Sequence, residues 1–242
     1  MAKQSRPLVI LTRPAAQSAR FAAALQARFG PLAVLISPLL MPALLVPPLP
    51  DRKFSALILT AQTAVQALAG ISAPLPRRAF CVGDRTAEAA QNAGLQAISA
   101  HGDAEDLIRL IQAHHPAPPL LHLRGRDSRG EIAARLTAAG LETQEAVVYD
   151  QRPHPLTPEA FAALSGPGPV LCPVFSPRTA SLLAEALPQP HAPLQIAAMS
   201  QATATPLLRC APVAIEIAAR PDADALMDAM AGFLAQKNAT DG

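Results

Sequence analysis

Short apolar runs alternate with alanine- and leucine-rich segments along the chain, and this alternation constrains the fold more than any other feature of the sequence. The apolar runs have the length of buried strands, and the segments between them are long enough for helices. Strands that alternate with helices favour parallel, doubly wound sheets with helices on both faces. We therefore predict an α/β protein, and 242 residues, half of them hydrophobic, are enough for two domains of ordinary size.

The expected elements fall into two similar halves. In the first half we expect strands at 8–11, 56–59, 79–82 and 96–98. We expect helices at 14–29, from 86 to Gly94 and at 104–113, and a further helix that begins after Thr60, its expected cap. In the second half we expect strands at 120–123, 170–175, 196–199 and 214–217, with helices at 130–139, after the cap Ser176, after Ser200, and from Asp222. Aligning the halves pairs Thr60 with Ser176, Thr86 with Thr203 and Gly30 with Gly140, which suggests an internal repeat of roughly 110 to 119 residues.

Two further apolar runs, at 33–42 and 145–153, each follow a helix-like segment that ends in glycine. Gly30 and Gly140 are expected to be the C-terminal caps of these helices. The second run holds Tyr149, the only tyrosine in a chain without tryptophan, and leads into a proline-rich break. We predict that the two runs are crossings between two domains and that the active site lies beside them.

Composition excludes several functional classes. A net charge of +2 from twenty basic and eighteen acidic residues leaves no basic stripe, so nucleic-acid binding is not expected. No apolar run approaches the roughly 20 residues that a bilayer requires, and no signal peptide is apparent, so we expect a cytosolic protein without membrane attachment. Cys81, Cys172 and Cys210 are far apart and are predicted to be buried free thiols. The six histidines lack ligand spacing, so we expect no metal site.

Four turns after expected strands share one form, at 12–14, 60–62, 83–86 and 176–178. Each offers backbone N–H groups at a helix start together with a hydroxyl or a guanidinium. Such a turn suits a carboxylate or a phosphate. In parallel sheets, ligands gather at this edge, where the strands end.

Short motifs follow one another in a characteristic order and spacing over essentially the whole chain: Leu11-Thr12-Arg13-Pro14, Leu59-Thr60 followed by Ala64-Val65, Val82-Gly83-Asp84-Arg85-Thr86-Ala87, Leu123-Arg124-Gly125, Val148-Tyr149, Phe175-Ser176-Pro177 and Thr203-Ala204. Taken together, these motifs resemble the uroporphyrinogen-III synthase family. The sequence departs from the family pattern at Ser200, where glycine is usual, and at Ala61-Gln62, where Ser-Pro or Ser-Ala is commoner.

The resemblance implies two flavodoxin-like α/β domains with parallel sheets, joined by a two-stranded β-ladder linker, and a tetrapyrrole bound in the cleft between them. One domain would combine residues 1–37 with 150–242, and residues 38–149 would form the other. Residue patterns alone predict two α/β halves and do not say which parts pack together.

The implied substrate is hydroxymethylbilane, a linear tetrapyrrole with eight carboxylates. The implied reaction loses water, inverts ring D and closes the macrocycle to uroporphyrinogen III, without metal or organic cofactor. It requires an acid for the leaving hydroxyl, a surface that stabilises the resulting cation, and a site that holds the chain folded. We therefore expect a lyase of tetrapyrrole biosynthesis, the pathway to haem, chlorophyll and cobalamin, that acts as a monomer.

Residue roles follow from the match. Tyr149 corresponds to the family tyrosine and would donate a proton to the leaving hydroxyl, although a half-buried strand tyrosine needs no catalytic role. The predicted substrate-binding residues are Arg13, Pro14, Thr60, Ala61, Thr86, Arg124, Gly125, Ser176, Pro177, Arg178, Ser200 and Thr203. The threonines and serines can equally be ordinary helix caps, and the arginines, Arg126 among them, can equally be solvated turn residues.

Two other functions stay open. A two-domain small-molecule binding protein of the periplasmic type would share the α/β halves and the crossing strands, but the expected absence of a signal peptide disfavours it. A non-catalytic tetrapyrrole-binding regulator on the same fold would carry an added DNA-binding or membrane segment, for which the chain up to Gly242 has no room.

Overall fold

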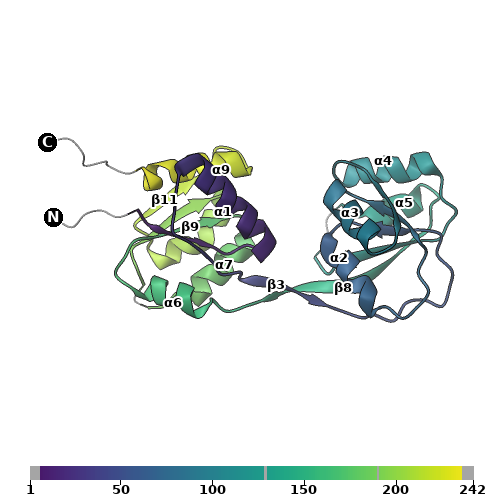
Figure 1. Cartoon of the computed structure of the whole chain (residues 1–242), viewed down its shortest axis with the longest axis horizontal. Helices are drawn as coiled ribbons and strands as arrows, with labels where there is room; N and C mark the ends of the chain where they lie inside the picture. The colour runs from purple at the N-terminus through teal and green to yellow at the C-terminus, as the bar shows by residue number, and fades with distance from the viewer. Residues whose placement is uncertain (1–5, 128–129, 190, 236–242) are drawn as a thin grey trace. The chain divides into compact units, whose positions relative to one another are not determined.

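The structure, a computed structural model, describes residues 6–127, 130–189 and 191–235. It divides into two compact units. One unit comprises the chain up to Met41 and from Pro153 onward, and the other comprises Pro42–Arg152. The predicted domain boundaries after residues 37 and 149 fall a few residues earlier, and the ends of the first predicted domain, 1–5 and 236–242, lie outside the described residues. Each unit has its own sheet with helices on both faces (Figure 1).

The first unit contains a five-stranded parallel sheet in the order β11-β10-β9-β1-β2. Its strands are β1 (Leu8–Leu11), β2 (Val34–Ile36), β9 (Val170–Val174), β10 (Leu194–Ala198) and β11 (Ala214–Ile217). Its helices are α1 (Ala15–Phe29), α6 (Pro158–Ser165), α7 (Pro177–Ala186), α8 (Gln201–Ala204), the 3-10 helix η2 (Thr205–Cys210) and α9 (Ala223–Leu234).

Alternate residues of the strands face opposite sides of this sheet, as strand geometry requires. Val9 and Leu11 of β1 pack with α1 and α9, whereas Ile10 packs with α6 and α7. All three side chains are at most 1% exposed, so β1 is buried on both faces. This is why β1 reads as a continuous apolar run instead of an alternating one.

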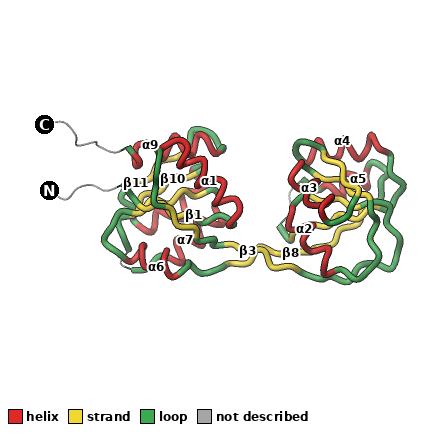
Figure 2. Tube along the Cα trace, viewed as in Figure 1, coloured by secondary structure: helices red, strands yellow, loops and turns green. Residues whose placement is uncertain are grey.

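The second unit contains a six-stranded sheet in the order β3-β8-β7-β4-β5-β6. Its strands are β3 (Leu40–Leu44), β4 (Leu57–Leu59), β5 (Arg78–Cys81), β6 (Gln96–Ser99), β7 (Leu120–Gly125) and β8 (Thr143–Pro153). Its helices are α2 (Gln62–Ala67), the 3-10 helix η1 (Leu68–Gly70), α3 (Asp84–Asn92), α4 (Ala104–His114) and α5 (Ile132–Ala138). Helices α2 and α3 pack on one face, and α4 and α5 on the other (Figure 2).

Both sheets are doubly wound, but their strand orders differ. The order β2-β1-β9-β10-β11 is the flavodoxin-like order 2-1-3-4-5, whereas β6-β5-β4-β7-β8, with the edge strand β3 left aside, is the order 3-2-1-4-5. In both orders the winding reverses once, so each unit has a switch point: β1 beside β9 in the first, and β7 beside β4 in the second. Ligands of such sheets bind at the carboxyl ends of the two strands at the switch point.

Most expected elements are confirmed, and three are wrong in detail. The apolar run at 33–42 is not one crossing strand, because β2 ends at Ile36 and β3 begins at Leu40, with a bend of the chain at Leu39 between them. The helix expected from Gly130 begins at Ile132, since Glu131 has a left-handed backbone with φ 45°. Thr60 does not cap α2, because the extended residue before that helix is Ala61.

Strand β3 lies beside β8 at the edge of the second sheet. The Leu45 N–H donates to the Val148 carbonyl at 2.8 Å, and the His154 N–H donates to the Leu39 carbonyl at 2.9 Å. Residue numbers rise along one segment as they fall along the other, so the pair is antiparallel. Its role as a linker between domains stays a prediction.

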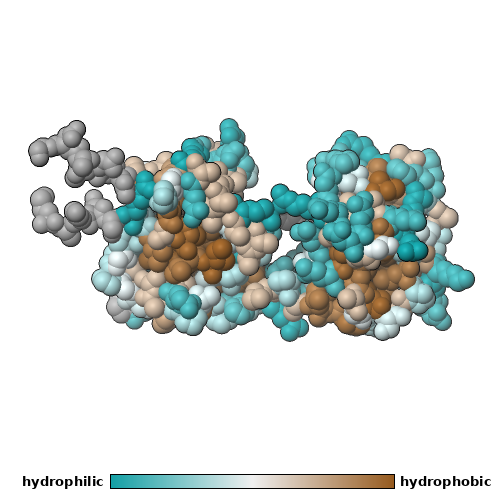
Figure 3. Space-filling view, in the orientation of Figure 1, coloured by the Kyte–Doolittle hydropathy of each residue, from teal (hydrophilic) through white to brown (hydrophobic). Residues whose placement is uncertain are grey.

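The helix caps follow the sequence closely. Gly30 and Gly140 have positive φ angles of 75° and 86°, and both N–H groups donate to carbonyls in the last turn of the preceding helix, which confirms the predicted glycine caps. Ser176 caps α7 ahead of Pro177, also as predicted. No helix in the described part of the chain is long and apolar enough to cross a membrane. Apolar side chains still reach the surface of both units, Val46 and Phe161 among them (Figure 3).

Candidate active site

At the switch point of the first unit, Arg13 follows β1 and Phe175 follows β9. The central carbon of the Arg13 guanidinium lies 4.0 Å from the centroid of the Phe175 ring, a cation–π contact. Phe21 of α1 packs edge-on against the same ring, with centroids 4.9 Å apart. The aromatic pair therefore holds a guanidinium where this fold binds its ligands.

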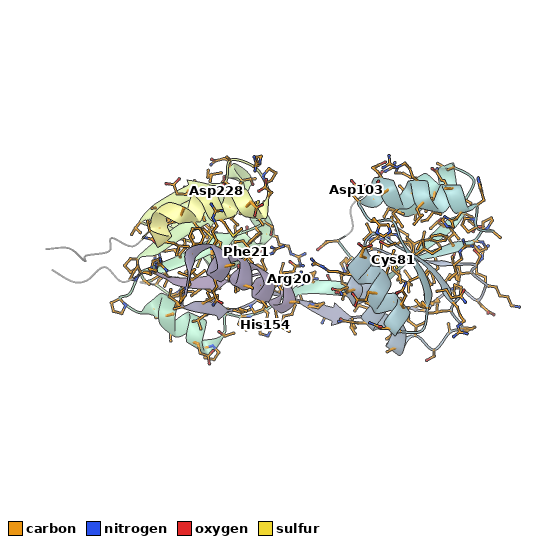
Figure 4. All side chains as sticks on the ribbon, turned by 45° about the horizontal axis from the view of Figure 1, so that its top comes forward. Arg20, Phe21, Cys81, Asp103, His154 and Asp228 are labelled. Atoms are coloured by element: carbon orange, nitrogen blue, oxygen red, sulfur yellow. The ribbon has the colours of Figure 1, made fainter. Side chains whose placement is uncertain are left out.

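The surroundings of Arg13 are those of an anion site. Burial, and then the nearby charge of Arg20, lowers the pKa of the Arg13 guanidinium, which nevertheless stays protonated at neutral pH. Arg20 lies on α1, next to Phe21 (Figure 4). Among the described residues Arg13 forms no ion pair with a carboxylate, and the buried Thr12 hydroxyl has no hydrogen-bond partner. A carboxylate would supply the charge and the acceptor that this site lacks.

The two predicted serines of the first unit act as helix caps. The Ser176 hydroxyl accepts from the Thr179 N–H at 3.2 Å, and the Ser200 hydroxyl accepts from the Thr203 N–H at 3.3 Å. In both helices the serine and threonine hydroxyls also bond to each other, at 2.9 Å and 3.1 Å. Thr203 is 1% exposed, so its hydroxyl serves this cap first.

The equivalent turns of the second unit lack side-chain caps. Ala61 precedes α2 and Gly83 precedes α3, and neither has a side-chain oxygen that could accept from the first turn. Thr86 occupies the same helix position as Thr203 and is also buried, which agrees with the predicted repeat. Because Thr60 stands one residue before the cap, the residue equivalent to Ser176 is Ala61, and the predicted pairing of Thr60 with Ser176 is wrong by one position.

Tyr149 lies on β8, directly opposite Gly125 of β7. A Cβ atom on Gly125 would stand 2.5 Å from Cε2 of the tyrosine ring and 2.9 Å from its hydroxyl oxygen. The ring therefore occupies the space that a side chain at position 125 would fill. Burial raises the pKa of the Tyr149 phenol, against a smaller lowering from its hydrogen bond to the Gly125 backbone. The phenol is thus protonated at neutral pH and can donate a proton.

Arg124 points back onto its own strand and onto β8. Its Nη1 donates to the carbonyls of Gly125 and Arg126, at 3.0 Å and 3.1 Å. Its Nε lies 2.9 Å from a carboxylate oxygen of Glu145, an ion pair without hydrogen-bond geometry. Much of this guanidinium is therefore engaged within the protein.

His122 is the one fully buried histidine among the described residues. Its Nδ1 lies 3.4 Å from Glu145, yet neither ring nitrogen has a hydrogen-bond partner in the described structure. Burial, more than the repulsion from Arg124, lowers the pKa of His122 to about 4 despite the nearby Glu145 carboxylate. The ring is therefore neutral at physiological pH.

Within each unit, the structure brings several predicted site residues together. Arg13 and Pro14 lie with Ser176 and Pro177 at the first switch point, whereas Thr60 and Ala61 lie with Arg124 and Gly125 at the second. Arg178 and Arg126 are exposed, and Arg126 pairs with Asp150 at 3.1 Å.

Three residues of these sites are absent from the sequence-based list. Arg20 lies on α1, whereas Arg13 precedes the helix, so helix periodicity does not link the two residues. Glu145 stands between the polar Thr143-Gln144 and the apolar Ala146-Val147-Val148, so its sequence context does not mark it as a site residue. The contact of Phe175 with Arg13 joins two segments that are far apart in the sequence, so no local pattern could reveal it.

No group of three or more His, Cys, Asp or Glu side chains within the described residues could hold a metal ion. The three cysteines are buried and free, as predicted. Burial raises the pKa of the Cys81 thiol to about 11 and that of Cys172 to about 12, so neither is a nucleophile at neutral pH.

Comparison with known proteins gives matches of sequence family and of fold. The model of the family described as uroporphyrinogen-III synthase HemD matches residues 23–228. A crystal structure of uroporphyrinogen-III synthetase from Helicobacter pylori 26695 has a TM-score of 0.58 at 18% identity, over 92% of this chain and 97% of that one. A mutant uroporphyrinogen III synthase from Thermus thermophilus has a TM-score of 0.42 at 16% identity, over 93% and 97% of the two chains. No curated protein sequence matches this chain.

Proposed function

Because the chain belongs to the uroporphyrinogen-III synthase family, we propose a reaction scheme in which Tyr149 supplies the acid and the two switch points bind the carboxylates of hydroxymethylbilane. The function of the chain is that of its family, a lyase-type closure of the linear tetrapyrrole to uroporphyrinogen III with inversion of ring D. The match of the family model to residues 23–228 is the observation that carries this conclusion.

Departure of the hydroxyl is the step that needs an acid. In our scheme the Tyr149 phenol protonates the terminal hydroxyl, the C–O bond breaks, water leaves and the remaining carbon becomes a cation. Ring D attacks this cation through its substituted α-carbon, which forms the first new C–C bond and gives a spiro intermediate. The older bond from that carbon to the methylene of ring C then breaks, and the methylene bonds to the free α-carbon of ring D. The proton lost from this carbon as the ring regains aromaticity restores the phenol. The net change is loss of one water, as in a hydro-lyase. The Tyr149 phenol carries the proton that this step needs, because its pKa, raised by burial, keeps it protonated at neutral pH.

Carboxylate binding is the second requirement of the scheme. Arg13 is the strongest candidate, since it is a half-buried cation with no acidic partner among the described residues and is fixed by Phe175. Arg20 adds positive charge beside it. The N-terminal turns of α7, α8, α2 and α3, at Ser176, Ser200, Ala61 and Thr86, would contribute backbone N–H groups.

Isomer analysis tests the proposal. Purified protein, at a small fraction of the bilane concentration, is mixed with freshly generated hydroxymethylbilane, the products are oxidised, and the uroporphyrin isomers are separated. Spontaneous closure gives isomer I, because inversion of ring D requires a spiro intermediate that the free bilane does not favour. Excess isomer III, with or without a chelator, is the expected result. Isomer I at every protein concentration would reject the assignment, and binding without conversion would favour a tetrapyrrole-binding regulator.

A location in the cytosol and a monomeric state remain predictions from the sequence.

A further inference from the structure

Strands β7 and β8 pair with a register shift immediately before the Tyr149 position. Arg124 lies opposite Val147, but Gly125 lies opposite Tyr149, so β8 advances two residues while β7 advances one. Such bulges redirect side chains and occur often beside active sites. Here the shift brings Tyr149 opposite a glycine.

Arg124 holds the chain on the β7 side of this bulge. Its Nη1 binds the carbonyls of both Gly125 and Arg126, which fixes the two peptide groups that follow the shift. The Arg126 N–H in turn donates to the Tyr149 carbonyl at 3.0 Å. Arg124 therefore directly precedes the glycine that contacts the phenol ring. It also binds the carbonyl of Arg126, the residue whose N–H binds the Tyr149 backbone.

Glu145 holds this guanidinium from the β8 side. Its carboxylate lies 2.9 Å from Arg124 Nε, and the same carboxylate lies 3.4 Å from the buried His122. An open pocket of about 430 Å³ adjoins the pair and is lined by Arg124, Glu145, Thr137 and Thr143 among others. The guanidinium would have room to leave its two carbonyls if Glu145 did not retain it.

We propose that Arg124 and Glu145 form a positioning pair that fixes the β7–β8 bulge and thereby sets the place of the Tyr149 hydroxyl for the reaction. Neither residue need touch the substrate in this scheme, and both act through Gly125 and Tyr149. The inference rests on the proposed role of Tyr149 as the acid. It also changes the expected role of Arg124 from carboxylate binding to positioning.

The composition of the chain provides a direct readout. Tyr149 is the only tyrosine and there is no tryptophan, so ultraviolet titration of the phenol reports on Tyr149 alone. The variant to test is Glu145→Gln, which keeps the shape and removes the charge. Glu142→Gln is the matched control, because Glu142 stands just before β8 and pairs with Arg52 at 2.7 Å, away from the bulge.

Glu145→Gln should lower kcat about tenfold and leave KM within about twofold, since misplacing an acid affects the transition state and not substrate binding. The pKa of Tyr149 should fall toward its ordinary value, because burial is the larger cause of its elevation. Glu145→Asp should recover part of the activity, and Arg124→Lys should resemble Glu145→Gln, since a lysine cannot reproduce the planar fork. Glu142→Gln should behave as wild type in both measurements.

A double variant separates this proposal from the acid role itself. If the pair acts through the phenol, Glu145→Gln should change kcat by less than about twofold in a Tyr149→Phe background. Two results would overturn the positioning role. One is an equal loss of kcat in both backgrounds. The other is a folded Glu145→Gln variant with wild-type kcat and an unchanged titration of Tyr149. Wild-type activity of Tyr149→Phe alone would instead reject Tyr149 as the acid, while a moved titration in Glu145→Gln would still support control of the phenol by the pair.

Discussion

Tyr149 is the side chain on which the proposed chemistry depends most directly. Replacing it with phenylalanine keeps the ring against Gly125 and removes the hydroxyl, so the fold should survive. We predict that kcat falls about 10- to 100-fold, at the low end of what general acids contribute, because part of the rate comes from positioning. Steady-state kinetics and circular dichroism check this prediction. Wild-type turnover would mean that Tyr149 is a packing residue.

Arg13 provides a second test at a single side chain. Arg13→Ala should raise KM on the order of tenfold with a smaller change in kcat, because a carboxylate contact distant from the reacting ring binds ground and transition states alike. Arg28→Ala is the matched control, since Arg28 lies on α1 and pairs with the exposed Asp228 at 2.5 Å. A normal KM with a large loss of kcat would locate Arg13 at the reacting ring instead.

Sequence motifs predict roles for single residues but not their contacts. The roles of Tyr149 and Arg13 come from local motifs and stay predictions. Arg124 is predicted to bind the substrate, and the structure adds that its guanidinium binds the carbonyls of Gly125 and Arg126 and faces Glu145. Side-chain direction at a bulge depends on pairing between two strands, which no pattern within one strand encodes.

Helix caps allow a test of one element. Ser200 stands where the family pattern has glycine, and its hydroxyl caps α8. Ser200→Ala should lower the free energy of unfolding by about 1 kcal/mol, whereas Ser200→Gly should cost only a few tenths, as at other N-caps. Urea denaturation measures both. Equal losses for alanine and glycine would show that the cap hydrogen bond contributes little here.

The centre of β7 should make the protein sensitive to mild acid. His122 titrates near its ordinary pKa of 6.5 in the unfolded chain but at about 4 when folded, facing Glu145 and Arg124. As pH falls from 6.5 toward 4, the unfolded chain binds a proton that the folded protein does not bind, so stability decreases across this window. The loss is on the order of 3 kcal/mol. His122→Leu should remove most of this slope in pH-dependent denaturation, and an unchanged slope would contradict it.

Element types and order were predictable because strands buried on both faces leave continuous apolar runs, and caps leave serine, glycine and proline at fixed offsets. The boundaries of these elements were less predictable. Thr60 fits the sequence pattern of a cap, but the extended backbone belongs to Ala61. The apolar run at 33–42 is divided at Pro38 and the bend at Leu39.

For the whole molecule, each half of the chain supplies strands to both sheets: β1 and β2 join β9 to β11, and β4 to β6 join β7 and β8. Periodicity predicts most of the strands but not this exchange, because both pairings bury the same apolar runs. Only the resemblance to a known family suggested the crossed arrangement in advance.

A single-turnover experiment tests the central claim most directly, namely that binding by this protein directs inversion of ring D while Tyr149 sets the rate. Protein in molar excess captures all of the bilane, and the oxidised products are separated by isomer. We predict isomer III from the wild type and also from Tyr149→Phe, the latter more slowly. Isomer I as the main product of the wild-type protein in excess would contradict the account.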